Sequence, residues 1–267
     1  MRLIGAVEAA AATGNPDEAV RLALGLAAYL RVRLLRAEAA WVLGIAEQIA
    51  QTPFERAQLL DTRADAAQQF DEAIALHEQA LELFRDQGRQ REEGIALMHL
   101  GITLRNAGRP KEAIDRHRQA LAIFQRIGPP YYPAAVWNNL ASAYSDNQAF
   151  GQAIRAADQA VEGFHACHNT TGEVMALFNR FRALRKLGHH KDALDAIQLA
   201  LARSADATVA PHELGQLLMA KADALQAAGH PKEERRAAFE AAAKAFDEAG
   251  LPDIGGIARE FAERNNT

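Results

Sequence analysis

The chain has 267 residues and a formal net charge of −4, and 49% of its residues are hydrophobic while 24% are charged. This composition is that of a folded protein and excludes a wholly disordered chain. Its 34 acidic and 30 basic residues are intermingled. Because nucleic-acid-binding domains usually carry a basic excess or stripe, direct binding of nucleic acid is not expected.

The sequence carries no sign of export or of membrane insertion. Cys167 is the one cysteine and cannot form an intrachain disulfide, so an oxidising compartment would gain nothing from it. The residues after Met1 lack the long apolar core of a signal peptide, because Glu8 interrupts the Ala-rich run. No run of roughly 18 apolar residues occurs. We therefore expect a soluble cytoplasmic protein with no membrane partner.

The N-terminal part is predicted to form helices without a regular repeat. The helices are expected near residues 2–13, 16–31, 35–51 and 54–68. Gly14-Asn15-Pro16 gives the turn signal that separates the first two. Ala19, just after that turn, is not connected by a clean repeat step with the regular array that follows.

From residue 70 onwards, an internal repeat organises the chain. Four segments align without gaps: Phe70–Ile74, Pro110–Ile114, Phe150–Ile154 and His190–Leu194. Their alanines Ala73, Ala113, Ala153 and Ala193 recur at one constant spacing, and Ala80, Ala120, Ala160 and Ala200 recur at the same spacing. A fifth copy begins at Gly229 after a one-residue slip. Two parallel series of alanines exceed what chance gives in an Ala-rich chain.

Each unit is predicted to be a pair of antiparallel helices. In the clearest unit, residues 92–106 place apolar side chains at helical spacing, and Gly108 ends that helix. Pro110 opens the second helix, which continues to Phe124. Small residues such as Gly101 are expected where the two helices cross. One pair cannot bury its apolar face alone, so the units must stack.

The segment Trp137–Tyr144, followed by Phe150, Ala153 and Ala160, resembles a tetratricopeptide repeat (TPR). The unit that contains Leu97, Leu100, Gly101, Leu104, Gly108, Ala113 and Ala120 matches nearly as well. The usual proline that ends the second helix is missing, and the units are about 40 residues long rather than 34. Longer units of this kind are similar to those of kinesin light chains and of bacterial sensor arrays. The resemblance covers about residues 54–249.

The N-terminal helices resemble the start of a particular sensor array. Thr13-Gly14-Asn15, then Ala19 through Arg31, then Glu38 through Ile49 are similar to the helices that follow the nucleotide-binding core in NB-ARC (STAND) signal-transduction ATPases, common in actinobacterial transcriptional regulators. The chain itself has no Gly-x-x-x-x-Gly-Lys-Ser/Thr phosphate loop and no basic helix-turn-helix. The resemblance therefore implies a sensor region rather than a nucleotide-hydrolysing core.

The predicted fold class is all-α. The TPR resemblance implies a right-handed superhelical solenoid of stacked antiparallel helix pairs, with about 14 helices. We expect a single TPR-like domain over residues 1–267. Within it, residues 1–53 form irregular N-terminal helices, residues 54–249 the regular repeats and residues 250–267 a C-terminal capping helix.

The histidines and the cysteine are the candidate catalytic or metal-binding side chains. His165 and His168 could share one face of a helix as metal ligands, although a helix C-terminus favours histidine through its dipole alone. His77 and His117 occupy the same position in successive units and are expected to pack alike. Cys167 lacks a recognisable activating base. We therefore predict no metal, no cofactor and no enzymatic activity.

In the resembled family, the first helix of each pair lines a concave groove. The predicted peptide-binding residues are Met98, Ile102, Arg105, Asn138, Asn139, Ser142, Phe178, Arg182, Arg185, Met219 and Asp223. Two alternatives stay open. The methionines and Phe178 could belong to the core, and the arginines could form a solvated face with ion pairs to Asp146 or Asp223.

Asn138 and Asn139 are the sharpest candidates for peptide binding. A side-chain amide can donate to a peptide carbonyl and accept from the neighbouring N–H, and groove asparagines do so in the peptide-binding arrays that this chain resembles. The Lys-and-Asn set that binds chaperone tails is not reproduced, since Ile95, Met98 and Ile102 occupy its positions. Residues 128–133 are expected to form a rigid aromatic loop, either as a simple turn or as a contact surface.

The sequence thus predicts a non-catalytic protein- or peptide-binding module. Most concretely, it would be the sensor or scaffold region of a larger bacterial signalling or transcriptional regulator. It would bind an extended peptide or a partner helix in its groove and transmit occupancy as a change of curvature. The alternatives are a small-molecule-binding or enzyme-accessory array and a self-associating structural module that forms homo-oligomers.

Overall fold

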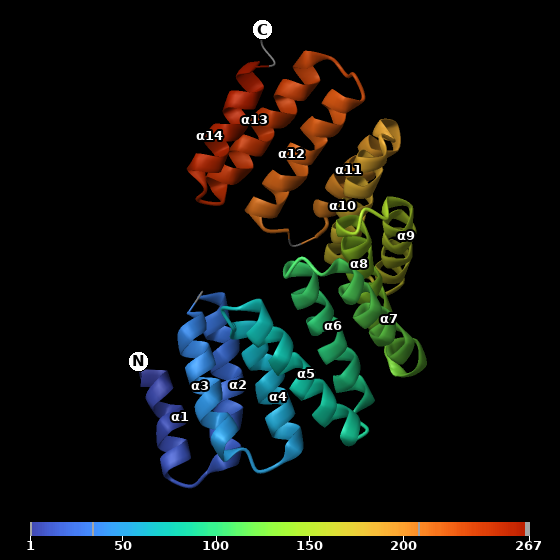
Figure 1. Cartoon of the computed structure of the whole chain (residues 1–267). Helices are drawn as coiled ribbons and strands as arrows, with labels where there is room; N and C mark the ends of the chain where they lie inside the picture. Colours follow the sequence, from blue (N-terminus) through green and yellow to red (C-terminus); the bar gives the residue numbers. More distant parts are fainter. Residues whose placement is uncertain (1, 34, 208, 265–267) are drawn as a thin grey trace. The chain divides into compact units, whose positions relative to one another are not determined.

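The computed structural model describes residues 2–33, 35–207 and 209–264, which form fourteen helices and no strand (Figure 1). They are α1 (Arg2–Ala12), α2 (Pro16–Val32), α3 (Arg36–Ile49), α4 (Pro53–Ala66), α5 (Phe70–Asp86), α6 (Gln90–Asn106), α7 (Pro110–Ile127), α8 (Tyr131–Asp146), α9 (Phe150–Ala166), α10 (Thr170–Leu187), α11 (His190–Ser204), α12 (Pro211–Ala227), α13 (Lys232–Glu248) and α14 (Pro252–Arg264). The all-α prediction is confirmed. None of these helices is both long and apolar enough to cross a membrane.

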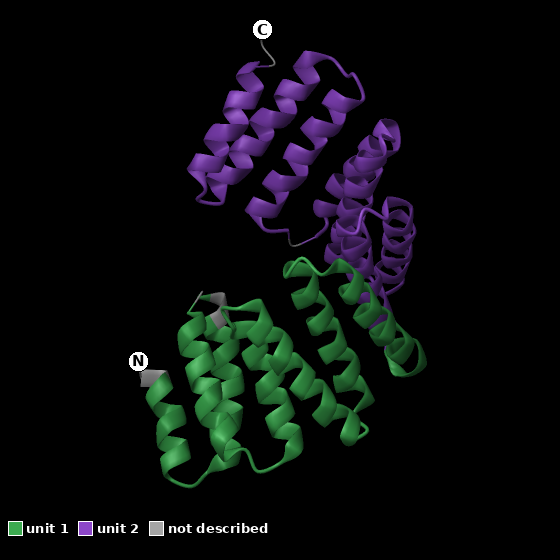
Figure 2. Ribbon diagram, in the orientation of Figure 1, with its two compact units in different colours: residues 1–128 green, residues 129–267 purple. Residues whose placement is uncertain are grey.

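The chain divides into two compact units, residues 1–128 and residues 129–267 (Figure 2). Unit 1 contains α1–α7 and unit 2 contains α8–α14. Within each unit, helices that follow one another along the chain pack together. The first helices of successive pairs also contact each other, α4 with α6 in unit 1 and α8 with α10 in unit 2. Stacked helix pairs of this kind are the arrangement that the repeat predicted.

The alanine series mark the helix crossings. Ala113, Ala153 and Ala193 are fully buried, and so are all four alanines of the second series. Gly101 faces the ring of His117 so closely that a Cβ atom at position 101 would collide with it. Small residues therefore lie where the spacing predicted, because a larger side chain would hold the paired helices apart.

Local signals account for where the helices begin and end. Thr52 caps α4, and the Glu55 carboxylate accepts from the Thr52 main-chain N–H to complete a capping box. Gly108 follows α6 with φ of +75°, a left-handed conformation that costs glycine little. One unit later, the equivalent turn holds Gln148 with φ of +59°. The turn thus keeps its geometry although its residue type changes.

The expected aromatic loop at residues 128–133 is wrong. α8 begins at Tyr131, so only residues 128–130 lie outside a helix. Both tyrosines lie in the first turn of α8, and the Tyr131 ring lies 6.0 Å from that of Phe164 on α9. Proline is tolerated in the first turn of a helix because the missing N–H would have no partner there. Pro133 therefore does not prevent α8 from starting at Tyr131.

Candidate functional site

The predicted groove residues all lie on first helices of the pairs. Met98, Ile102 and Arg105 lie on α6 of unit 1, and all three are half-buried. The remaining residues lie in unit 2, on α8 (Asn138, Asn139, Ser142), α10 (Phe178, Arg182, Arg185) and α12 (Met219, Asp223). Unit 2 thus carries most of the predicted set on three helices.

A pair of asparagines links α8 to α10. Asn179 Nδ2 donates to Asn138 Oδ1 at 2.8 Å, and the two side chains are buried, with exposures of 8% and 7%. Ser142 is also buried, and its hydroxyl donates to the Asn138 main-chain oxygen at 3.4 Å. The amide oxygen of Asn138 is therefore engaged inside the protein. Asn139, which is half-buried, is the groove asparagine with more exposed surface.

Asn179 was not among the predicted residues, although the repeat held a signal for it. It lies one repeat after Asn139 and so occupies the equivalent position. Equivalent positions therefore use one residue type in two ways. In α10 the amide spans to the neighbouring first helix, whereas in α8 it remains partly exposed.

Phe178 and Met219 lie at the edge of the hydrophobic core of unit 2. Both are partly buried and pack against that core. The Phe178 ring lies 5.9 Å from the ring of Phe181, whose side chain is buried. Phe178 and Met219 thus pack against the core and also keep some accessible surface. The alternative that they belong to the core is therefore correct in part.

A cleft of about 250 Å³ opens between α10 and α12. We call it the basic cleft, and its lining residues are Phe181, Arg182, Arg185, Lys186 and Asp223. Arg185 spans it with a bidentate ion pair, its Nε and Nη2 donating to Asp223 at 2.7 and 2.6 Å. The alternative that the arginines form a solvated face with ion pairs is therefore correct for Arg185. Hydrogen bonding to Asp223 raises the pKa of the Arg185 guanidinium.

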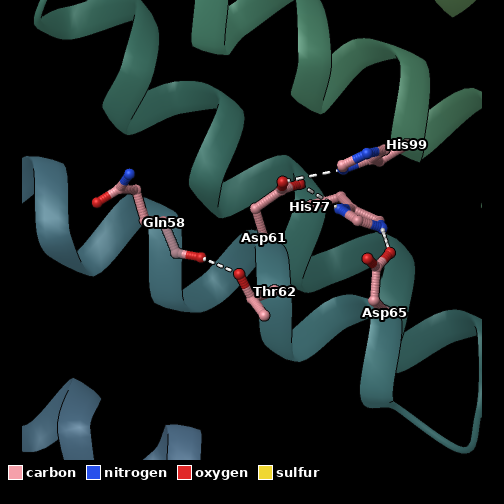
Figure 3. A network of polar contacts seen from close by, with 6 residues as sticks. All are labelled: Gln58, Asp61, Thr62, Asp65, His77 and His99. Carbon is pink, nitrogen blue, oxygen red and sulfur yellow. Dashed lines mark hydrogen bonds and ion pairs between the residues drawn. The ribbon is translucent and has the colours of Figure 1, made fainter. Parts of the chain in front are cut away.

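Unit 1 contains a polar network that was not predicted from the sequence (Figure 3). Asp61 on α4 accepts from His77 Nδ1 on α5 at 2.8 Å and from His99 Nδ1 on α6 at 3.0 Å. Asp65, one turn later on α4, lies 3.9 Å from His77 Nε2. The carboxylate of Asp61 thereby joins three helices. His77 is fully buried, whereas the side chain of Asp61 is 14% exposed.

The charge of Asp61 is sustained by its histidine partners. Burial disfavours ionisation of this carboxyl group, but the hydrogen bonds and charges of His77 and His99 outweigh burial. As a result, the pKa of Asp61 lies well below its usual range. A cleft of about 290 Å³ adjoins this network, lined by Thr62, Asp65 and His99 together with Leu24, Ala27, Ala28 and Ala66.

The expectation that His77 and His117 pack alike is wrong, since both are buried but they face different residues. Gly101 lies one repeat after Asp61, so His117 meets a glycine where His77 meets a carboxylate. Neither ring nitrogen of the buried His117 has a hydrogen-bond partner among the described residues. Burial, aided by the charge of Arg105, lowers the pKa of His117 from 6.5 to about 3.

We expect the His117→Leu variant to resist mild acid better than the wild-type protein. His117 stays neutral when folded, while the unfolded chain binds a proton below pH 6.5, so the wild type loses stability as the pH falls from 6.5 towards 3. Between pH 7.5 and 5, the wild type should lose about 1–2 kcal/mol relative to the variant. Urea unfolding at the two pH values measures this. Substituting the exposed His212 by Gln is the control, and equal pH profiles for wild type and His117→Leu would contradict the assignment.

His165 and His168 do not share one helix face, because α9 ends at Ala166 and His168 takes φ of +54° in the following turn. His165 instead bonds the buried Glu173 at 2.8 Å, and Arg203 contacts the other oxygen of Glu173 at 3.3 Å. Over the described ranges, no three His, Cys, Asp or Glu side chains are grouped to hold a metal ion.

Residues 56–126 match the tetratricopeptide repeat family. The matched segment lies within α4–α7, and it confirms the TPR resemblance for that part of the chain. No curated protein matches the sequence.

Solved structures share the fold at low sequence identity. The chain is similar to the STAND protein with a tetratricopeptide repeat sensor from Pyrococcus horikoshii, with 16% identity and a TM-score of 0.70 over 96% of this chain and 44% of that one. A Rap protein complexed with competence and sporulation factor is 13% identical, with a TM-score of 0.66 over 92% of this chain and 74% of the Rap protein. A kinesin light chain with nearly identical TPR-like repeats from Podosopora anserina is 20% identical, with a TM-score of 0.62 over 74% of this chain and 98% of that one. The chain thus shares the TPR-like solenoid fold of both groups that the repeats resembled.

Proposed function

We propose that this chain is a non-catalytic module that binds a peptide or a partner protein. The binding surface is the row of first helices in unit 2, namely α8, α10 and α12. The observation that carries the proposal is the set of polar groups on this row. Asn139 and Arg182 keep accessible surface there, while Asn138, Asn179 and Ser142 are buried and hold the helices together.

The chemistry of this surface suits an extended backbone. The Asn139 amide can donate to a peptide carbonyl and accept from a peptide N–H, independently of the peptide's side chains. Phe178 and Met219 supply apolar surface on the same row of helices, and they are anchored in the core, so little conformational entropy is lost on binding. The complex of the similar Rap protein with competence and sporulation factor supports a peptide as the ligand class.

The biological setting that we favour is the sensor or scaffold region of a bacterial signalling regulator. The similar STAND protein carries a tetratricopeptide repeat sensor, and this chain corresponds to less than half of that protein's length. We also propose that residues 1–267 act as one domain and that the chain is not an enzyme. The engagement of His77 by Asp61 and of His165 by Glu173 supports structural roles for these histidines.

Selection from a displayed library of random dodecapeptides would test this function. We expect peptides that bind the wild-type chain, and we expect Asn139→Ala to weaken the best of them by about tenfold in a fluorescence polarisation assay, since one buried amide contact is lost. Lys191→Ala on α11, an exposed change away from the row, is the control. Failure to recover any binder, or equal affinities for wild type and Asn139→Ala, would refute the proposed surface.

A further inference from the structure

We propose that the basic cleft between α10 and α12 is a carboxylate-binding subsite, which holds an acidic side chain of the bound peptide. This inference rests on the proposed function and names the chemistry that the peptide must carry. The cleft presents three cationic side chains, Arg182, Arg185 and Lys186, and one carboxylate, Asp223. Its charge balance therefore favours an anionic ligand.

The cations of the cleft are not equally available. Arg185 is committed to Asp223 through two hydrogen bonds. Arg182 and Lys186 are exposed and form no ion pair with the residues that the structure describes. They are four residues apart on α10, so their side chains extend from the same face of the helix. A ligand carboxylate would thus meet these two cations, with Asp223 already neutralised.

The Arg185–Asp223 ion pair holds the lining of the cleft in place and leaves room for a ligand. A bidentate guanidinium–carboxylate contact fixes both side chains, and it joins α10 to α12 at the cleft. The floor is Phe181, whose side chain is only 5% exposed. An apolar floor excludes water on one side and strengthens the attraction between a bound carboxylate and the cations above it.

The concentration of cations is specific to α10. On α8, the repeat positions of Arg182 and Lys186 hold Ser142 and Asp146, and on α12, after the one-residue slip, they hold Asp223 and Ala227. The pair of cations is therefore confined to α10 on this row. A volume of about 250 Å³ is below that of typical drug-sized pockets, and it suits a single acidic side chain.

A small dicarboxylate tests the subsite without any peptide. Glutarate is titrated into the full chain while the arginine Nε–Hε signals are followed by NMR. We expect saturable shifts of the Arg182 and Arg185 signals. Binding is followed through the Arg185 signal in every variant, and it should be at least about tenfold weaker in Arg182→Gln and in Lys186→Gln, since each removes one charge-assisted contact. High salt should weaken binding as well. Thermal midpoints confirm that both variants, changed at exposed positions, remain folded.

Two control variants separate the subsite from the rest of the surface. Lys191→Gln removes a cation from α11 outside the cleft and should leave glutarate binding unchanged. Asn139→Ala should also leave it unchanged, although it is expected to weaken displayed peptides.

The absence of a saturable shift, or an Arg185 shift in Arg182→Gln with the same affinity as in the wild type, would overturn the carboxylate subsite. If displayed peptides still bound under that outcome, the proposed function would stand without it. Glutarate binding in a chain that recovers no peptide would instead support the subsite and refute the peptide-binding function.

Discussion

Replacing Asp61 by Ala should lower the free energy of unfolding by about 2–4 kcal/mol at pH 7. The carboxylate accepts from His77 and His99 and thereby joins α4, α5 and α6 (Figure 3). Its loss would leave the fully buried His77 without its 2.8 Å acceptor. Removing one partner of a buried pair costs more than the pair's net contribution, because the other group stays desolvated. Urea unfolding monitored by circular dichroism measures the change.

The contribution of Asp61 should also depend on pH with a defined sign. Its pKa is lower in the folded protein than in the unfolded chain, where an aspartate titrates near about 3.9. The stabilisation is therefore fully present above about pH 4 and is lost as the pH falls further, towards the folded pKa. Wild type and Asp61→Ala should converge in stability in that acidic range. If instead the two differed equally at pH 7 and pH 2.5, the ionised carboxylate would not be the stabilising species.

Replacing Ala153 by Leu should destabilise the protein by about 1–3 kcal/mol, because the extra methyl and methylene groups would overpack a helix crossing. Ala153 has no exposed surface, and it belongs to the alanine series that recurs once in every repeat. Ala113→Leu, at the same position in the preceding repeat and equally buried, should behave alike.

The neighbouring residue provides the control for this substitution. Gln152 is exposed on the same turn of α9, so Gln152→Leu should change stability by less than about 0.5 kcal/mol. Thermal and urea unfolding of the three variants compare the two buried positions with the exposed one. Equal losses for Ala153→Leu and Gln152→Leu would show that the helical register assigned from the repeat is wrong.

Most of the fold could be predicted from the sequence because repeats carry their own internal comparison. Ala153 alone says little, but four alanines at one spacing define which face of each second helix is buried. Gly108 marked the end of α6 for a similar reason, since it takes the left-handed conformation that glycine adopts at low cost.

Much of the candidate site could not be predicted, because side-chain partners come from other helices. The repeat placed Asn138 and Asn139 on one surface, but only the packing of α8 against α10 shows that Asn179 engages Asn138. Asp61 escaped notice because its equivalents are small residues such as Gly101 and Ala141. A comparison of the repeats does not single out such a residue, because its partner His99 comes from the next helix pair.

The two solutions at this helix crossing bear on how such repeats diverge. One copy pairs a glycine with a neutral histidine, and the other pairs an aspartate with a histidine that it bonds. Both copies keep the histidine, so they differ in the residue that faces its ring from the first helix. Asp61 bonds the ring of His77, whereas any side chain at position 101 would collide with the ring of His117 where it now lies. A designer who introduced an aspartate at position 101 would therefore also have to move the His117 ring before the two groups could bond.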